Sequence, residues 1–196
     1  MRGGKTLLKR IIALFLLFLV LFASCAAPTS SGDEITETFR TLPSATYAVS
    51  VTSSFPSRET SHTLEYIYKK EKQGRITVIA PEDVKGIALT VQDGSGTLSF
   101  DGAYLETGPL DASGLSPFSA LPALMNVWQE GNFREIQNAK IFGQDSFLVI
   151  SEKASEESIL EYRTWFSKEK FLPLFAEIFS DGKRVIQCKF ERAEHT

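Results

Sequence analysis

Cys25 is the residue whose surroundings predict chemistry most clearly. Four basic residues lie near the start of the chain: Arg2, Lys5, Lys9 and Arg10. An unbroken apolar run, Ile11 to Phe22, follows them, and the small residues Ala23 and Ser24 separate this run from Cys25. This order is typical of a secretory signal peptide with a cleavage site before the cysteine. As a helix, about 13 apolar residues reach only about 20 Å against a hydrocarbon core of roughly 30 Å, which argues against a permanent membrane span.

The segment Phe22-Ala23-Ser24-Cys25 resembles the bacterial lipobox, although Phe22 stands where that motif prefers leucine. The resemblance implies that residues 1–24 are removed as a lipoprotein signal peptide. It also implies that the Cys25 thiol takes a diacylglycerol and that Cys25 becomes the new N-terminus, lipid-anchored on the extracytoplasmic side of the cell membrane. An uncleaved anchor and a secreted soluble form are the two alternatives.

The charge balance argues against a nucleic-acid partner. The signal segment holds four of the 21 basic residues and none of the 24 acidic ones, so the mature chain is strongly acidic. Phosphate neutralisation needs clustered Lys and Arg. The acidic balance also leaves no polybasic membrane signal, and several acyl chains on Cys25 would have to hold the protein at the bilayer.

The other residues capable of chemistry predict neither an enzyme nor a metal site. The two histidines are His62, at a polar strand margin, and His195, which we assign to a terminal tail. Neither has the spacing of a zinc ligand set. The acidic cluster of Glu156, Glu157 and Glu161 lacks a calcium-loop pattern and is interpreted as a solvated turn. Cys188 alternates with apolar residues and is predicted to be a buried thiol, and no intramolecular disulfide can form in the mature chain. We expect no cofactor.

Period-two alternation dominates the chain beyond residue 43. Residues 25–34 are predicted to be a flexible tether, and residues 35–196 one β domain, with a short helix expected over Asp33 to Leu42. Short turns such as Asp93–Gly96 and Asp101-Gly102 join neighbouring strands antiparallel. The pattern predicts a mainly β (α+β) fold of about ten strands with one or two covering helices.

The clearest helical segment carries an apolar stripe: Phe118, Leu121, Met125 and Trp128. Gly131 stands where a C-terminal cap belongs, and Pro122 is expected near a first turn or at a break. Aromatic residues beyond it are candidates to line a cavity beneath this helix: Trp165, Phe166, Phe171 and Phe175. The sequence leaves two interpretations open, a filled core and an apolar ligand pocket under a helical lid.

Three short segments resemble the LolA/LolB family of lipoprotein carriers and receptors. They are Gly74 to Pro81, Val91 to Gly102, and Thr164-Trp165 through Leu172-Pro173-Leu174 to Gly182. The resemblance implies a half-open antiparallel β-barrel closed by helices around a hydrophobic cavity. A lipidated chain is closer to the receptor type, or to the related germination lipoproteins of spore-forming clostridia, than to the soluble carrier.

Two functions follow from this resemblance. The first is a non-enzymatic, membrane-anchored envelope lipoprotein whose half-barrel binds an envelope protein partner or forms a homodimer, with spore germination as one setting. The alternative is a lipid or lipoprotein carrier that holds acyl chains in the cavity. A carrier needs an open apolar cavity, whereas a partner-binding module should have a filled barrel and an exposed apolar or edge-strand patch.

Overall fold

The computed structural model describes residues 31–55, 58–70, 73–154 and 158–196. Residues 31–196 form one compact unit, which is the unit described below. The predicted signal peptide and Cys25 lie outside the described residues.

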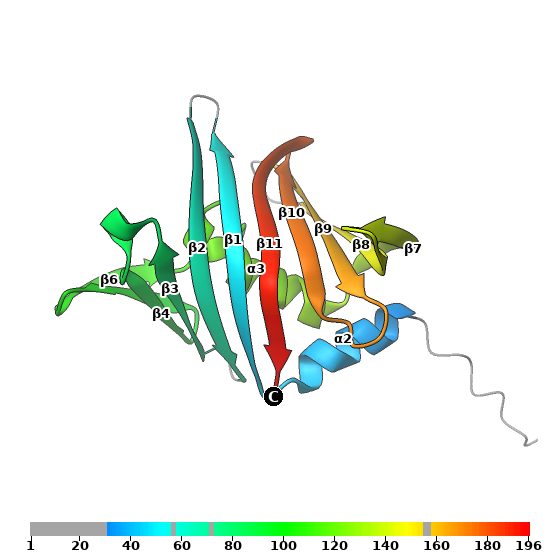
Figure 1. The fold of residues 1–196 in the computed structure, drawn as a ribbon, viewed down its shortest axis with the longest axis horizontal. Helices are drawn as coiled ribbons and strands as arrows, with labels where there is room; N and C mark the ends of the chain where they lie inside the picture. Colours follow the sequence, from blue (N-terminus) through cyan, green and yellow to red (C-terminus); the bar gives the residue numbers. More distant parts are fainter. Residues whose placement is uncertain (1–30, 56–57, 71–72, 155–157) are drawn as a thin grey trace, which may run out of the picture. The chain divides into compact units, whose positions relative to one another are not determined.

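One antiparallel sheet of eleven strands makes up the unit, in the spatial order β6-β5-β4-β3-β2-β1-β11-β10-β9-β8-β7 (Figure 1). The first six strands are β1 (Ser44–Phe55), β2 (Arg58–Lys69), β3 (Gln73–Ala80), β4 (Ala88–Gln92), β5 (Ser95–Phe100) and β6 (Ala103–Pro109). The remaining five are β7 (Phe133–Ile141), β8 (Gln144–Ala154), β9 (Ile159–Ser167), β10 (Pro173–Ser180) and β11 (Lys183–His195). The last strand inserts beside β1, so two meanders join into one open sheet.

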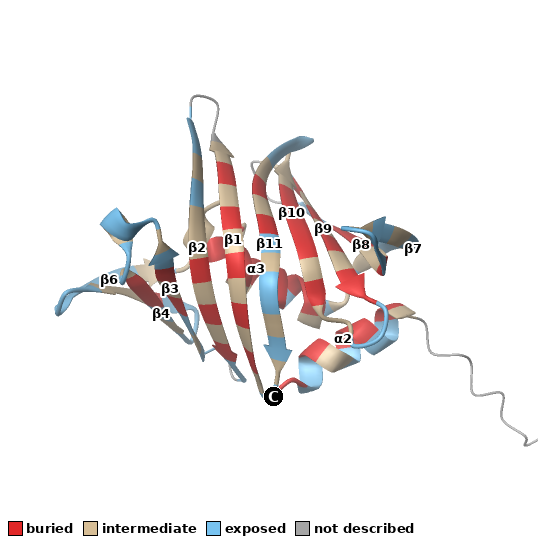
Figure 2. Ribbon diagram, in the orientation of Figure 1, coloured by how far each residue is buried: buried red, intermediate tan, exposed pale blue. Residues whose placement is uncertain are grey.

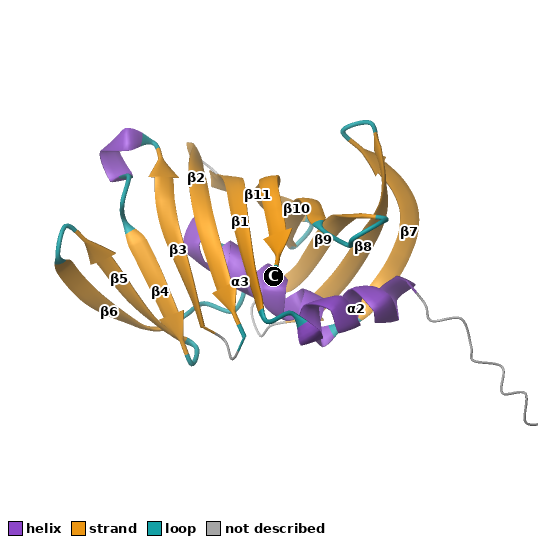
Figure 3. Ribbon diagram, turned by 60° about the horizontal axis from the view of Figure 1, so that its bottom comes forward, coloured by secondary structure: helices purple, strands orange, loops and turns teal. Residues whose placement is uncertain are grey.

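Two α-helices accompany the sheet: α2 (Ser31–Thr41) and α3 (Pro117–Glu130). A short 3-10 turn, η1 (Glu82–Val84), connects β3 to β4. Figure 3 shows the sheet curving around α3, with α2 at one end of the strands. The predicted half-open antiparallel barrel with covering helices is confirmed.

Helix α2 begins at Ser31, so the end of the predicted tether, residues 31–34, is helical in the structure. Its buried residues include Ile35 and Phe39, which lie at helical spacing and enter the core. The compact unit therefore begins at Ser31, four residues before the expected start at residue 35.

Pro122 lies inside α3 and the helix continues through it. The sequence prediction placed this proline near the first turn or at a break. The helix begins at Pro117 after the cap Ser116, so Pro122 falls in the second turn, where tertiary packing outweighs the loss of one backbone hydrogen bond.

The core lies between α3 and the middle strands. Burial alternates along these strands, as the banded colouring of Figure 2 shows. On β1 the inward side chains are Tyr47, Val49 and Val51, each at most 1% exposed. Because successive strand residues point to opposite faces, the sheet has one face turned to α3 and one turned away from it.

Candidate functional site

The apolar stripe of α3 is part of a filled core. Leu121, Met125 and Trp128 are each 2% exposed, and Leu124 is fully buried. Phe118 is partly buried and packs against the same cluster. Four of the six predicted cavity or lid residues therefore lie together on the inner side of this helix, in contact with the sheet.

The start of α3 is held by its own cap and by the sheet. The Ser116 hydroxyl accepts from the Ser119 amide, and the Ser119 hydroxyl accepts from the Ser116 amide, each at 3.1 Å. These reciprocal bonds form a capping box. From β9, the Tyr162 hydroxyl donates to the carbonyl oxygen of Ser113 at 2.9 Å. Burial, followed by the nearby carboxylates of Asp111 and Glu130, raises the pKa of Tyr162 to about 12, so it remains a donor at physiological pH.

The end of α3 is held by α2. The Arg40 guanidinium donates to the carbonyl oxygens of Gln129 and Glu130, at 2.8 and 3.0 Å. These carbonyls have no partner within the helix, and a cation beside them also complements the helix dipole. Gly131 ends α3 with a φ of 71°, and a Cβ there would lie 2.3 Å from the Thr36 hydroxyl oxygen. Close approach of the two helices therefore requires glycine at this position.

A side-chain amide links both helices to the sheet. Gln129 Nε2 donates to the Tyr68 hydroxyl oxygen at 2.7 Å and to the carbonyl oxygen of Phe39 at 3.1 Å. Tyr68 lies on β2, so one residue of α3 is bonded to α2 and to a strand. Sequence patterns gave no signal for Arg40, Gln129 or Tyr162, because their partners are up to 90 residues away.

Trp128 is the centre of an aromatic cluster beneath α3. Its ring centroid lies 4.9 Å from that of Phe39 on α2 and 5.3 Å from that of Phe166 on β9. Its indole N–H donates to the Thr164 hydroxyl at 3.0 Å, so the one polar atom of the ring is satisfied. This packing fixes the helix in position.

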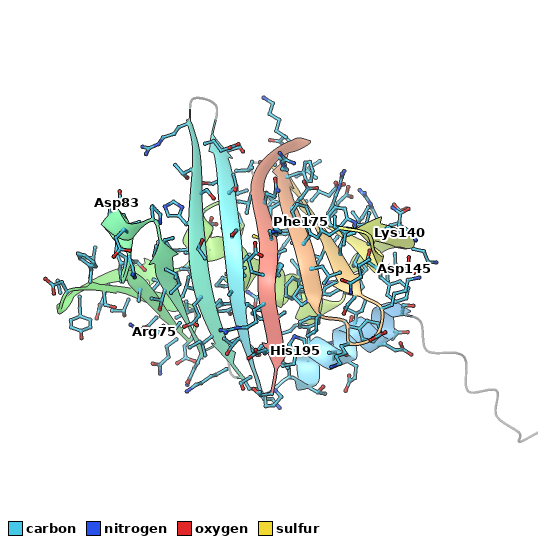
Figure 4. All side chains as sticks on the ribbon, viewed as in Figure 1. Arg75, Asp83, Lys140, Asp145, Phe175 and His195 are labelled. Atoms are coloured by element: carbon cyan, nitrogen blue, oxygen red, sulfur yellow. The ribbon has the colours of Figure 1, made fainter. Side chains whose placement is uncertain are left out.

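Trp165 and Phe175 do not lie beneath the helix, and that expectation is wrong for these two residues. Trp165 stands between Thr164 and Phe166, which both contact Trp128, so its own side chain points to the opposite face of β9. Phe175, labelled in Figure 4, is opposite Trp165 in the β9–β10 pairing. The two ring centroids are 5.4 Å apart. Aromatic residues occur on both faces of this part of the sheet, which sequence alternation could not assign to one side.

His195 belongs to the fold and not to an unstructured tail. It is the last residue of β11, beside α2 in Figure 4, and its Nε2 lies 2.9 Å from the Tyr47 hydroxyl oxygen. Its ring also packs edge-on against Phe39, with centroids 5.4 Å apart. Burial lowers the pKa of His195 and raises the pKa of Tyr47, so both are neutral at pH 7.

The hollow between α3 and the strands is small. A pocket of about 180 Å³ opens between β2, β3 and α3, and its wall combines apolar residues such as Leu110 and Met125 with polar ones such as Asp111, Asn126 and Gln129. Ligand sites for drug-sized molecules are usually about 300–1,000 Å³ and largely apolar. A wider hollow of about 580 Å³, at the turns that end β7 and β9, is lined by charged residues such as Asp145, Lys168 and Glu169. The first hollow is smaller than such sites, and the second is lined by charged side chains, which do not favour an acyl chain.

The remaining chemical candidates are structural where the structure describes them. Cys188 is confirmed as a buried thiol, and burial raises its pKa to about 12. Glu161 pairs with Arg134 and Arg163 at 2.9 and 2.7 Å, while Glu156 and Glu157 lie outside the described residues. Among the described residues, no three His, Cys, Asp or Glu side chains gather as a metal site would require.

No helix in the described ranges is both long enough and apolar enough to cross a bilayer.

No family model matches the chain, and no curated protein matches its sequence. Its structure is similar to that of an uncharacterised conserved protein from Thermus thermophilus, with a TM-score of 0.53 at 10% identity, over 85% of this chain and 88% of that chain. It is also similar to a LolA superfamily protein from Nitrosomonas europaea (TM-score 0.47, 11% identity, 83% and 92% covered). A third similar chain, at TM-score 0.49 and 10% identity over 88% and 98%, comes from the structure of the CwlD amidase from Clostridioides difficile in complex with the GerS lipoprotein.

At such identities these similarities concern the fold alone. This chain shares its fold, an open antiparallel sheet curved around a helix, with the Thermus thermophilus protein.

Proposed function

We propose that this protein is a non-enzymatic lipoprotein of the cell envelope whose β domain binds a protein, either an envelope partner or a second copy, and does not carry lipid. In this proposal residues 1–24 are the signal peptide, Cys25 carries the lipid on the extracytoplasmic side, and the residues between Cys25 and Ser31 lead to α2. A setting in spore germination stays a prediction from the sequence resemblance.

The filled inner face of the sheet carries the proposal. A carrier must open its helix to admit an acyl chain of many methylene groups. Here Met125 and Trp128 are almost fully buried, and α3 is bonded at both ends to the rest of the domain. Displacing the helix would expose this core to water, at a free-energy cost of about 25 cal/mol per Å² of apolar surface. It would also leave the Gln129 and Glu130 carbonyls without the Arg40 donor.

Metabolic labelling with a photoreactive palmitate analogue separates partner binding from lipid carriage. Cells that produce the full chain are irradiated, and the labelled peptides are mapped. We expect label on the peptide that contains Cys25 and none on α3 or on β2 and β3, which surround the 180 Å³ pocket. Photo-crosslinks within α3 or those strands would overturn the proposal in favour of the carrier.

The anchor is tested separately with Cys25→Ala. This variant should keep its signal peptide and take up no radiolabelled palmitate, because no thiol remains at the proposed cleavage site to accept the diacylglycerol. Cys188→Ala is the matched control, since that thiol is fully buried and its loss should leave the labelling unchanged. Undiminished labelling of Cys25→Ala would contradict the assignment.

A further inference from the structure

The outer edge of β6 is open to strand pairing. In the described part of the chain, β6 is the terminal strand of the sheet and pairs only with β5. Tyr104 is 77% exposed and Leu105 is 63% exposed, and Glu106 is the one charged residue of the strand. Proteins usually block such edges with charges, bulges or proline, because an exposed apolar edge templates pairing with another chain. In β6 the bulge is at Thr107 and the proline is Pro109, at the far end of the strand, so Ala103 to Glu106 remain regular.

The opposite edge of the sheet, β7, is blocked by charge. Its Arg134 is paired with both Glu152 and Glu161, and its Lys140 lies 3.2 Å from Asp145. Pairing β6 with β7 of another molecule would bring Tyr104 and Leu105 against these charged side chains. It would also join unlike edges, which generates open filaments and no closed dimer. The β6 edge therefore fits a second β6 better than it fits β7.

A row of apolar side chains leads from the core to this edge. Ile76 on β3 is opposite Leu89, Leu89 is opposite Leu98, and Leu98 is opposite Leu105. Ile76 and Leu89 are at most 3% exposed, so the row starts inside the core and ends at an exposed leucine. A further leucine beside Leu105 would continue the row and remove apolar surface from water.

The turn before β6 determines which backbone groups point outward. Asp101 and Gly102 both have positive φ, 45° and 79°, as in the two-residue hairpin turns that match strand twist. Phe100 and Ala103 close this hairpin as a hydrogen-bonded pair, so alternation directs the N–H and C=O groups of Tyr104 and Glu106 away from β5. Three registers would pair these outward groups between two copies of β6.

Only one of the three registers suits the side chains. Placing Glu106 opposite its own copy opposes two like charges, which is destabilising. Placing Tyr104 opposite its own copy sets Glu106 against the turn glycine Gly102 and shortens the pairing. The third register places Leu105 opposite Leu105 and Tyr104 opposite Glu106, and it joins the two leucine rows.

We propose that β6 pairs antiparallel with β6 of a second copy of this chain, about a two-fold axis at Leu105, and extends the sheet across the dimer. This inference deepens the protein-binding function proposed above, by naming the partner and the surface. The lipid anchor proposed above would hold both copies in one membrane and so raise their effective concentration at this edge.

Disulfide crosslinking at the two-fold axis tests the register. Leu105→Cys is introduced into the full chain, which is purified in detergent, oxidised mildly and run on a non-reducing gel. The two Cα atoms of this non-hydrogen-bonded pair would be about 4.5 Å apart, within the range of a disulfide. We expect most of the variant to run as a reducible dimer. The unsubstituted chain measures any contribution of the native cysteines.

Ala103→Cys is the matched control on the same strand. In the proposed register the two Ala103 residues are about four positions apart, or about 14 Å, which is beyond disulfide reach. This variant should give no more dimer than the unsubstituted chain. Equal crosslinking of Ala103→Cys and Leu105→Cys, or a Leu105→Cys band no stronger than that of the parent, would overturn the proposal.

A charge at the axis tests the dimer without any cysteine. Leu105→Lys opposes two ammonium groups and should weaken the dimer by at least about tenfold in sedimentation velocity. Thermal unfolding should be unchanged at concentrations where both proteins are monomeric, because Leu105 is exposed. Ile159→Lys, at a 58% exposed residue of β9, should leave the dimer intact. A parent chain that sediments as a monomer sinks the β6 dimer but leaves the palmitate-mapping test of protein binding against lipid carriage unaffected.

Discussion

The middle of the sheet and its wing, strands β4 to β6, have the same alternating pattern of side chains. They differ in how their inward side chains are covered. Under α3, the inward residues of β1, β9 and β11 are buried, and even the tryptophan N–H has a partner. In the wing, the inward row ends at the exposed Leu105, and β6 is exposed along most of its length. The difference is the helix: α3 and α2 cover one region, and the described chain supplies nothing to cover the edge of the other. A filled centre with an open edge is expected of a protein-binding module, whereas a carrier needs an open apolar cavity at the centre.

The largest expected effect is at the centre. Met125→Glu would bury an unpaired carboxylate under α3, and the domain should fail to fold, since such a burial costs several kcal/mol. Asn126→Glu is the control, because the neighbouring residue is exposed and should tolerate the charge. Circular dichroism and thermal unfolding measure both variants. A folded Met125→Glu protein would contradict the fixed packing of α3 and would break the contrast between centre and wing.

Two neighbours on β9 compare the two faces of the sheet directly. Phe166→Ala removes a fully buried ring beneath Trp128 and should lower the free energy of unfolding by about 3–5 kcal/mol. Trp165→Ala removes a half-buried ring on the opposite face and should lower it by clearly less. Urea unfolding of both variants provides the comparison. A larger loss for Trp165→Ala would reverse the assignment of faces.

The link between the helices should have a moderate effect. Arg40→Ala removes two donors from the carbonyls that end α3, and because the side chain is exposed we expect a loss of about 1 kcal/mol. Arg40→Lys keeps the charge but loses the two-pronged geometry, and should recover only part of that loss. Equal stability of the lysine variant and the parent would mean that charge alone holds the helix end. Chemical denaturation at low and high salt separates the contribution of the charge, which salt screens, from that of the hydrogen bonds.

The smallest effect expected is the pH dependence due to His195. Burial lowers its folded pKa below the usual 6.5, so its contribution to stability is fully present above pH 6.5. The contribution is lost as pH falls below 6.5 toward the folded pKa, because the unfolded chain takes up the proton first. His195→Gln should therefore lose less stability than the parent between about pH 7 and pH 5. Parallel pH profiles for the two proteins would contradict this prediction.

Many of the strands, and the meander of the first half, could be predicted from the sequence. The period-two alternation and the Asp-Gly turns located β7 and β11 and the hairpins of the first meander, because strand pattern and turn chemistry are local properties. The alternation of Cys188 with Ile186 and Phe190 also identified a buried thiol. Local pattern fails where both faces of a strand are apolar. In β9 the neighbours Trp165 and Phe166 are both aromatic, so no polar residue indicates which of them faces away from the core. The sequence prediction therefore placed Trp165 on the same side as Trp128.

The sequence by itself determined the signal-like start, the lipobox-like Cys25, the β-rich class and the stripe of α3, since each depends on residues close together in the chain. Only the tertiary structure decided that His195 packs on Tyr47, that Arg40 holds α3, and that the space beneath the helix is filled. These features depend on residues between 36 and 148 positions apart, and their energies come from burial and hydrogen bonds that exist only after the sheet has curved around the helix. The open edge at Leu105 is of the same kind, because a strand is an edge only when the whole order of the sheet is known.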